Sequence, residues 1–370
     1  MTASPAGAIH PVRRARAAAL LDRPEQDELT LDALLVTNLH NVRYLTGFSG
    51  SNGALLLSHH GSGVLFTDPR YTVQSQRQVD CAVRIAKGPL AQAVLLEIRR
   101  SRARRVGFER DTMTVAQFET LEKGLPERTR LMPATGLIER LRMVKDAGEI
   151  ESIRASVISN SRALEAALRL FKPGMTESDL AAEIDYRNRK FGAEAPSFDT
   201  IVAAGERAAL PHAQPGATKI GPGMLLIDMG AFRSGYASDM TRMAHVGPAT
   251  PKYKRAYRAV LEAQLAGVDA VKPGVTAGSV DGVVRRTLKK HGLDREFIHS
   301  AGHGLGLEIH EPPRLGRKDK TKLEAGMTIT VEPGIYIEGW GGIRIEDTIV
   351  VTAKGCEILT PTTKELREIG

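Results

Sequence analysis

The stretch HSAGHGLGLEIHEPP, from His299 to Pro313, gathers residues that could do chemistry. It holds three of the ten histidines of the chain, His299, His303 and His310. Clustered histidines can be metal ligands, proton carriers or ordinary core and surface residues. Because the glycines on either side of His303 let the backbone crowd close to a site, we expect His303 to be a ligand and the other two histidines to be helpers.

Four acids stand at strand-like segments of nearly unbroken apolar character. Asp228 ends LLID, Asp239 lies in GYASDMT, Glu332 ends TITVE and Glu346 lies in GIRIED. Burying a lone carboxylate is costly, so acids in such strands need an explanation. They could face solvent on a half-exposed sheet, but four symmetric positions argue against that reading.

Convergence of the four carboxylates would create strong mutual repulsion. All four could ionise together only with cations among them. Two divalent ions about 3.5–4 Å apart, with some carboxylates bridging both, would offset the charge. His303 would add one nitrogen ligand. Carboxylate-rich coordination suits Mn²⁺ and the imidazole also admits Co²⁺ or Zn²⁺, so we expect two divalent ions per chain, with Mn²⁺ preferred.

The elements that must position these residues occur twice. FKPGMTESDLAAEI from Phe171 and VKPGVTAGSVDGVV from Val271 lie 100 residues apart and share a Pro-Gly helix stop and a Thr-led helix start. PGMLLIDMG and AGMTITVEPG share Gly-Met, an apolar strand and an acid. A second strand follows in each copy, and the acids Asp239 and Glu346 are 107 residues apart. Two copies are too few for a solenoid, so we predict a duplicated α+β half packed as a pseudo-twofold pair.

The first part of the chain alternates strands and helices, which predicts a small α/β domain. A long amphipathic helix opens within LRMVKDAGEI, from Leu141, and we place the domain boundary before it, giving domains of residues 1–140 and 141–370. The predicted strands are 32–37, 53–58 and 63–68, and the predicted helices are 69–79, 90–100 and 114–125.

Composition limits the class of protein. A hydrophobic content of 42% and a charged content of 25% are typical of soluble globular chains. The net charge of +8 favours encounters with anions, but no nucleic-acid-reading motif occurs, so we expect no nucleic-acid partner. No apolar run approaches the roughly 18 residues of a membrane span, so we expect no membrane partner.

The N-terminus and the cysteines bear on location. HPVRRARAAALLDRPEQDEL, from His10, is rich in Arg and Ala like a transit peptide but has no apolar core like that of a secretory signal. We interpret it as a first helix. Cys81 and Cys356 are far apart and have no CxxC partner, which suits a reducing cytoplasm.

Four motifs together resemble the M24 metallopeptidases, the pita-bread family of methionine aminopeptidases, Xaa-Pro aminopeptidases and prolidases. They are IDMGAFRSGYASDMTR, HSAGHGLGLEIHEPP, TVEPGIY and GGIRIEDTIVV. DALLVTNLHNVRYLTGFSGSNGALLL and FTDPRYTVQ further resemble the creatinase-type N-terminal domain of the proline-specific members. The resemblance implies a creatinase-like domain at 1–140, a pita-bread catalytic domain at 141–370 and five ligands to two metal ions, of which Asp239 and Glu346 bridge. The implied ligands are Asp228, Asp239, His303, Glu332 and Glu346.

The same resemblance implies roles around the metals. Glu332 would also pass the proton of the attacking water to the leaving nitrogen. His212 and His310 would contact substrate and stabilise the oxyanion, with His299 in support. Arg344 and Tyr336 would form a pair that orients the carboxylate ligands, although Tyr336 could simply pack beside a hairpin turn.

The resemblance also implies hydrolysis of an Xaa-Pro bond by a homodimer, and we favour a dipeptide substrate. A dipeptide brings its proline carboxylate into the site, and that charge needs a cation. Arg314 is the first candidate, although it could be a solvated loop residue, and Arg70 is the second. The alternatives are an Xaa-Pro aminopeptidase acting on longer peptides and a metal-free relative that binds or hydrolyses something else.

Overall fold

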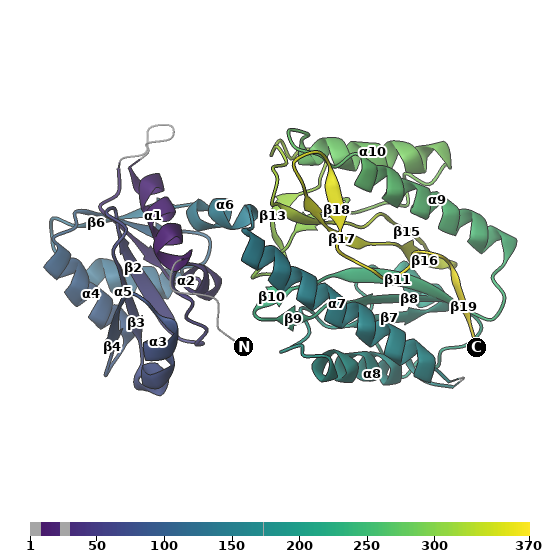
Figure 1. Ribbon diagram of the computed structural model, residues 1–370, viewed down its shortest axis with the longest axis horizontal. Coiled ribbons are helices and arrows are strands. Elements are labelled where there is room, and N and C mark those ends of the chain that lie inside the picture. The colour runs from purple at the N-terminus through teal and green to yellow at the C-terminus, as the bar shows by residue number, and fades with distance from the viewer. Residues whose placement is uncertain (1–8, 23–29, 173) are drawn as a thin grey trace. The chain divides into compact units, whose positions relative to one another are not determined.

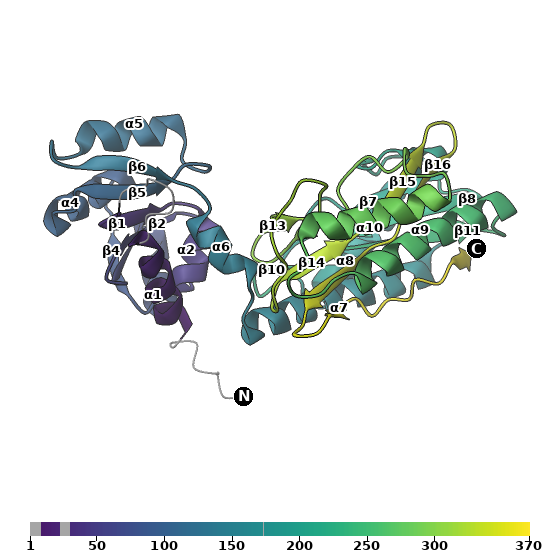
Figure 2. The same ribbon diagram turned by 90° about the horizontal axis from the view of Figure 1, so that it is seen from above.

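The computed structural model describes residues 9–22, 30–172 and 174–370, and divides the chain into two compact units. The first unit ends at Arg142 and the second runs from Met143 to Gly370. Figures 1 and 2 show the elements of each unit in two views. Within the described residues, no helix combines the length and the apolar character needed to span a membrane.

The first unit is built on a six-stranded sheet in the order β4-β3-β2-β1-β5-β6. The central strand β1 is antiparallel to β2 and parallel to β5, and its four residues are all buried. The sequence predicted β1, β2 and β3, whereas β4, β5 and β6 are found only in the structure. The bounds are β1 (Ala33–Val36), β2 (Gly53–Ser58), β3 (Gly63–Thr67), β4 (Ala82–Ile85), β5 (Arg105–Glu109) and β6 (Arg130–Ala134).

Helices cover this sheet. Val94, Leu95 and Ile98 on one face of α4 pack into the apolar core of the unit with Phe66 and Val106. The segment expected as a first helix forms α1, and its residues 23–29 lie outside the described part of the chain. The bounds are α1 (Ile9–Leu21), α2 (Leu39–Thr46), the 3₁₀ turn η2 (Pro69–Tyr71), α3 (Thr72–Gln78), α4 (Leu90–Ser101), α5 (Val115–Gly124) and α6 (Leu137–Met143).

The second unit consists of two halves with the same order of elements. Each half has two helices followed by a sheet whose two long strands are extended by a short two-stranded hairpin. The first half comprises α7 (Ala147–Leu170), α8 (Glu177–Lys190), β7 (Ile201–Ala204), η3 (Gly205–Ala209), β8 (Gly223–Met229), β9 (Phe232–Arg233), β10 (Tyr236–Ala237) and β11 (Met240–Val246).

The second half closes with strands near the C-terminus. Its sheet has the order β13-β12-β14-β17-β18, whereas the sheet of the first half has the order β19-β11-β8-β7. The elements are α9 (Pro251–Asp269), α10 (Ala277–Lys290), β12 (His303–Gly304), β13 (Glu311–Arg314), β14 (Thr328–Val331), β15 (Gly334–Ile337), β16 (Gly341–Arg344), β17 (Asp347–Val351), β18 (Cys356–Ile358) and β19 (Arg367–Ile369).

The duplication extends to local contacts. Thr176 caps α8 by accepting a hydrogen bond from the Asp179 backbone, and Thr276 caps α10 in the same way from Ser279. Each threonine also forms an isolated bridge, to Lys219 in one half and to Lys322 in the other. The two helix pairs lie on opposite sides of the strands (Figure 1). The sheet of the first half is covered on both faces, by α7 and α8 on one side and by the core shared with the second half on the other. Its long strands β8 and β11 therefore carry apolar residues in nearly unbroken runs.

Candidate metal centre

The four predicted acids occupy equivalent places in the two duplicated hairpins. Asp228 is near the end of β8, and Asp239 lies in the break between β10 and β11. Glu332 directly follows β14, and Glu346 lies in the break between β16 and β17. Between Asp228 and Asp239 the chain forms the short strand β9, which pairs with β10, so the acids stand where each hairpin leaves its main sheet.

His303 meets these acids from the neighbouring strand β12. Its Nε2 lies 3.4 Å from Asp239 Oδ2 and 3.5 Å from Glu332 Oε1. One potential ligand atom each of Asp239, His303 and Glu346 lies within 4.8 Å of the others. Three of the five predicted ligands therefore form one compact group, and Glu332 reaches the same histidine.

Burial and repulsion act on the acids together. Burial raises the pKa of Asp239 to about 7, and the charges of Asp228 and Glu332 add to this rise. Burial also raises the pKa of Asp228, against the opposing effect of Arg344, and raises the pKa of Glu346, to which Asp239 and Glu332 contribute. The metal-free site therefore favours protonated acids.

His303 responds in the opposite sense. Burial lowers the pKa of His303, but its hydrogen bond with Asp239 and the charges of Glu332 and Asp239 outweigh burial and raise the pKa to about 9. The protons held by Asp239 and His303 compensate charge that a divalent ion would otherwise compensate.

The site fits divalent cations on its own atoms. Asp228 Oδ1 is buried and has no hydrogen-bond partner within the described residues, so a ligand remains to be supplied. Four carboxylates and one imidazole match Mn²⁺, Co²⁺ or Zn²⁺ as ligand types. The residues that could hold such ions are Asp228, Asp239, His303, Glu332 and Glu346.

A buried chain of hydrogen bonds fixes Asp228. Arg344 donates through Nη2 to Asp228 Oδ2 at 2.6 Å and through Nη1 to the Tyr336 hydroxyl at 2.6 Å. His299 Nε2 is 2.9 Å from the same hydroxyl. Burial raises the pKa of Tyr336 to about 12, so the hydroxyl keeps its proton. His299, Tyr336 and Arg344 thus act on the acids through one another.

Two threonines that the sequence analysis did not identify also hold the ligands. Thr241 donates to Glu346 Oε2 at 2.8 Å and accepts from Arg344 Nε at 2.9 Å. Thr330 donates to Glu332 Oε1 at 3.2 Å and accepts from the His303 backbone at 3.1 Å. Each threonine is two residues from a predicted ligand, Asp239 or Glu332. Residues two apart in a strand lie on the same face, and this spacing could have indicated from the sequence that each threonine lies beside a ligand.

The remaining predicted residues surround the acids at more exposed positions. His310 is exposed, and its ring centroid lies 4.5 Å from that of His303. His212 is also exposed and follows Pro211, whose carbonyl accepts a hydrogen bond from Arg344. Arg314, paired with His303 across β12 and β13, donates through Nε to Ser300 Oγ at 3.2 Å. These side chains have room to meet a substrate.

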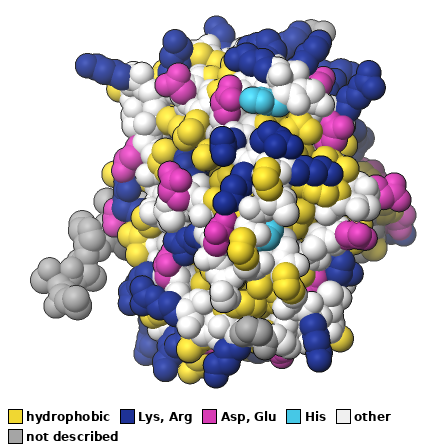
Figure 3. All heavy atoms as spheres, turned by 90° about the vertical axis from the view of Figure 1, so that its right-hand side faces the viewer, with side chains coloured by type: hydrophobic (Ala, Val, Ile, Leu, Met, Phe, Trp, Pro, Cys, Tyr) yellow, Lys and Arg dark blue, Asp and Glu magenta, His cyan; other side chains and the backbone are white. Residues whose placement is uncertain are grey.

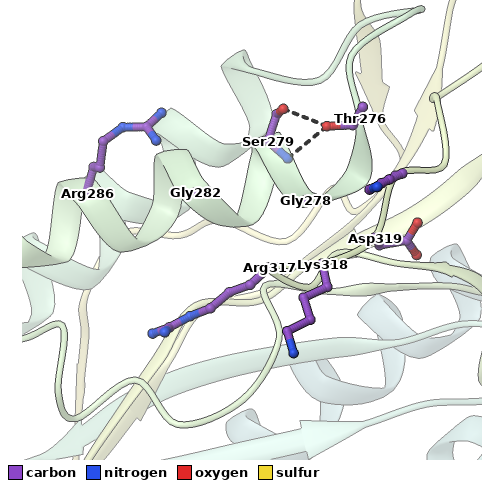
Figure 4. A pocket seen from close by; sticks show the side chains of 9 residues that line it. Thr276, Gly278, Ser279, Gly282, Arg286, Arg317, Lys318 and Asp319 are labelled. Carbon is purple, nitrogen blue, oxygen red and sulfur yellow. Dashed lines mark hydrogen bonds between the residues drawn. The ribbon is translucent and has the colours of Figure 1, made fainter.

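A hollow elsewhere in the same unit contains none of these residues. A pocket of about 630 Å³ lies between α10 and the loop 317–320. In Figure 4, Arg286 extends from the upper side of α10, while Arg317 and Lys318 extend from the lower side of the loop. These cations do not converge on a point. On the face shown in Figure 3, Lys and Arg are likewise interspersed with acidic and hydrophobic side chains.

Comparison with known families divides the chain at a similar place. The sequence profile described as metallopeptidase family M24 matches residues 151–353. The profile described as the creatinase/prolidase N-terminal domain matches residues 16–144.

Individual proteins match along nearly the whole chain. It is 36% identical over 342 residues to an Xaa-Pro dipeptidase of Pyrococcus furiosus, covering 92% of this chain and 96% of that protein. A solved Xaa-Pro dipeptidase from Bacillus anthracis is 37% identical with a TM-score of 0.92, covering 97% of this chain and 100% of that one. A solved X-Pro aminopeptidase from Thermotoga maritima is 35% identical with a TM-score of 0.86, covering 92% and 98%.

The close approach of two strands beside His303 generates a stability prediction. A Cβ on Gly302 would lie 2.0 Å from the Thr330 carbonyl oxygen, so Gly302→Ala should lower the free energy of unfolding by about 1–3 kcal/mol or more. Gly355→Ala is the matched control, because a Cβ there meets no atom within 4 Å. Urea unfolding followed by the fluorescence of Trp340, the sole tryptophan of the chain, measures both. Equal stability of the two variants would contradict the packing described.

Proposed function

The chain belongs to metallopeptidase family M24, and we propose that it is a dinuclear Xaa-Pro dipeptidase. The observation that carries the proposal is the convergence of His303 with buried acids from both duplicated hairpins. The similarity to an Xaa-Pro dipeptidase over 92% of the chain supports the reaction, and the pita-bread fold predicted from the sequence is confirmed by the family and structural matches.

The proposed metal ligands are the five residues that the sequence predicted. Asp239 and Glu346 would bridge two ions, with Mn²⁺ preferred over Co²⁺ or Zn²⁺. Divalent ions, when bound, lower the pKa of water and polarise a carbonyl group. The chain holds three of the acids through one oxygen, by the bonds of Arg344 to Asp228, of Thr241 to Glu346 and of Thr330 to Glu332, and this orientation supports a ligand role.

Glu332 is proposed to move the proton. Its side chain is 17% exposed, whereas that of Asp239 is 7% exposed, and Asp228 and Glu346 are also buried. Glu332 can therefore reach both the attacking water and the substrate. Thr330 holds it through Oε1. The carboxylate takes the proton of the water and delivers it to the proline nitrogen, which must be protonated to leave as an amine.

Two exposed histidines complete the proposed reaction site. His212 and His310 would donate hydrogen bonds to the carbonyl oxygen as it gains negative charge during attack. Burial lowers the pKa of His310, and His303 and His212 add to this decrease, which supports a position of both exposed histidines at one site. His299 would act in support, through the Tyr336 hydroxyl.

Arg314 is proposed to bind the carboxylate of a dipeptide. It lies on β13 opposite His303. Within the described residues, only Nε of its guanidinium donates a hydrogen bond, so its two Nη groups can donate to a carboxylate. Arg70, the second candidate, is held by both oxygens of Asp68, which favours Arg314. We include a cytoplasmic homodimer in the proposal. The homodimer rests on the family resemblance, and the free thiols Cys81 and Cys356 suit the compartment.

Metal content provides the first test. Asp239→Asn should abolish activity and reduce bound metal below two ions per chain, while Asp269→Asn, an exposed acid at the end of α9, should retain both. Elemental analysis of dialysed protein measures this. Because the pKa of Asp239 is raised to about 7 and that of His303 to about 9, protons compete with metal below these values. Apparent Mn²⁺ affinity of metal-free protein should therefore rise between pH 6 and pH 9. Full activity in metal-free Asp239→Asn protein would exclude the dinuclear site.

Kinetics separate the two roles of Glu332. Glu332→Gln should lower kcat by roughly 10²–10⁴-fold, the range typical of lost general acid–base catalysis, with a smaller change in KM. Glu338→Gln, on the exposed turn between β15 and β16, is the control and should leave both constants unchanged. A loss confined to KM would assign Glu332 to binding alone.

The rates of hydrolysis of a dipeptide and a tripeptide test whether the substrate is a dipeptide. The wild type should hydrolyse Ala-Pro faster than Ala-Pro-Ala, and Arg314→Ala should lower kcat/KM for Ala-Pro by about 10–100-fold, equivalent to one charge-assisted hydrogen bond. Arg317→Ala, at an exposed position three residues beyond Arg314, is the control. Equal or faster cleavage of Ala-Pro-Ala by the wild type would identify an aminopeptidase, the activity named for the Thermotoga maritima structure.

A further inference from the structure

A buried ion pair lies beside the loop that carries His310. Lys145 Nζ is 3.0 Å from Glu311 Oε2, and the two side chains are 1% and 3% exposed. Nζ also donates to the Met143 carbonyl at 3.3 Å. Neither residue is a predicted ligand or substrate contact, so the pair has no part in the reaction described above.

The burial of this pair calls for a reason other than stability. Desolvating two charges offsets most of their attraction, and apolar replacements of similar volume are often as stable. Breaking such a pair, in contrast, leaves a buried charge without compensation. A pair of this kind fixes one arrangement of the segments that it joins.

Lys145 is anchored to the strand that leads to Glu332. Its backbone N–H donates to the Gly326 carbonyl at 3.0 Å, and its neighbour Val144 forms a bridge with Met327, immediately before β14. Lys145 therefore has a fixed position relative to β14, the strand that Glu332 follows.

Glu311 organises the loop between His303 and itself. Its Oε1 accepts a hydrogen bond from the Glu308 backbone N–H at 3.1 Å, while its Oε2 accepts one from Lys145 Nζ. A Cβ on Gly306 would lie 2.8 Å from both carboxylate oxygens, so the glycine lets the loop pack directly on the carboxylate. The Gly306 carbonyl in turn accepts from the Ala237 backbone at 2.8 Å, two residues before Asp239. The loop folds around one carboxylate, and His310 is the residue next to it.

We infer that Lys145 is a positioning residue for His310. Its ion pair with Glu311 joins the β14 entry to the loop 304–310, and so fixes where His310 stands relative to Glu332. The inference rests on the proposed role of His310 in the reaction. Without the pair, the Glu311 carboxylate loses its buried contact with Lys145, and the loop loses the contact that joins it to the β14 entry.

Hydrogen exchange and kinetics of Lys145→Met test the inference. Amide exchange of the segment 304–311 in the substrate-free enzyme should become faster, while exchange of β8 (Gly223–Met229) stays at the wild-type rate. For Ala-Pro, kcat should fall by roughly 10–100-fold, as expected for a reacting group displaced by about 1 Å, with a smaller change in KM. Lys145→Arg, which keeps the charge, should recover part of the lost kcat.

Two further variants distinguish positioning from stability. Lys254→Met removes a lysine from an exposed pair with Glu368 and should change neither exchange of 304–311 nor kcat. Lys145→Met combined with Glu311→Gln removes both buried charges, so its Tm should recover toward that of the wild type while kcat stays low.

The outcomes separate this inference from the proposed function. A destabilised Lys145→Met enzyme with wild-type exchange in 304–311 and wild-type kcat would overturn the inference. Recovery of kcat together with Tm in the double variant would also overturn it. Faster exchange of the loop with unchanged kcat would overturn the catalytic role of His310, and with it the link to catalysis, while the measured metal content and Glu332 kinetics would still test the proposed function independently.

Discussion

Repulsion among buried carboxylates is the constraint on which the catalytic unit depends. Burial raises the pKa of Asp228, Asp239 and Glu346, and the neighbouring acids contribute to each of these shifts. A metal-free scaffold can hold such acids only by binding protons, which makes its stability depend on pH. Cations that replace those protons relieve the repulsion. Repulsion among the buried carboxylates therefore destabilises the metal-free fold and also favours the binding of divalent cations.

The scaffold leaves this repulsion incompletely compensated. Arg344 neutralises one oxygen of Asp228, and the other oxygen is buried without a partner within the described residues. Thr241 and Thr330 hold Glu346 and Glu332 with single neutral hydrogen bonds. Neutral donors orient a carboxylate without cancelling its charge. Further arginines at these positions would compete with a metal ion for the same oxygens.

Much of the fold and the five candidate ligands could be predicted from the sequence because their signals are local or repeated. The duplicated helix starts at Thr176 and Thr276 and the paired acids recur at nearly constant spacing. The strand β4 was missed because it has only four residues, too few to show a period, and none of them is fully buried. Thr241 looks like an ordinary strand residue, and Lys145 and Glu311 look like surface charges. Their partners lie far away in the chain, so only the tertiary structure reveals them.

The duplication also has a consequence for biosynthesis. Each half contributes two acids, and the candidate ligands extend from Asp228 to Glu346, so the chain must leave the ribosome through Glu346 before all of them can meet. Contacts between distant segments form late, because closing a long loop costs entropy before the contact is gained. A nascent chain that ends before β12 (His303–Gly304) contains only Asp228 and Asp239 of the five candidate ligands. Binding of ions by all five candidate ligands therefore requires that both halves have been synthesised and folded.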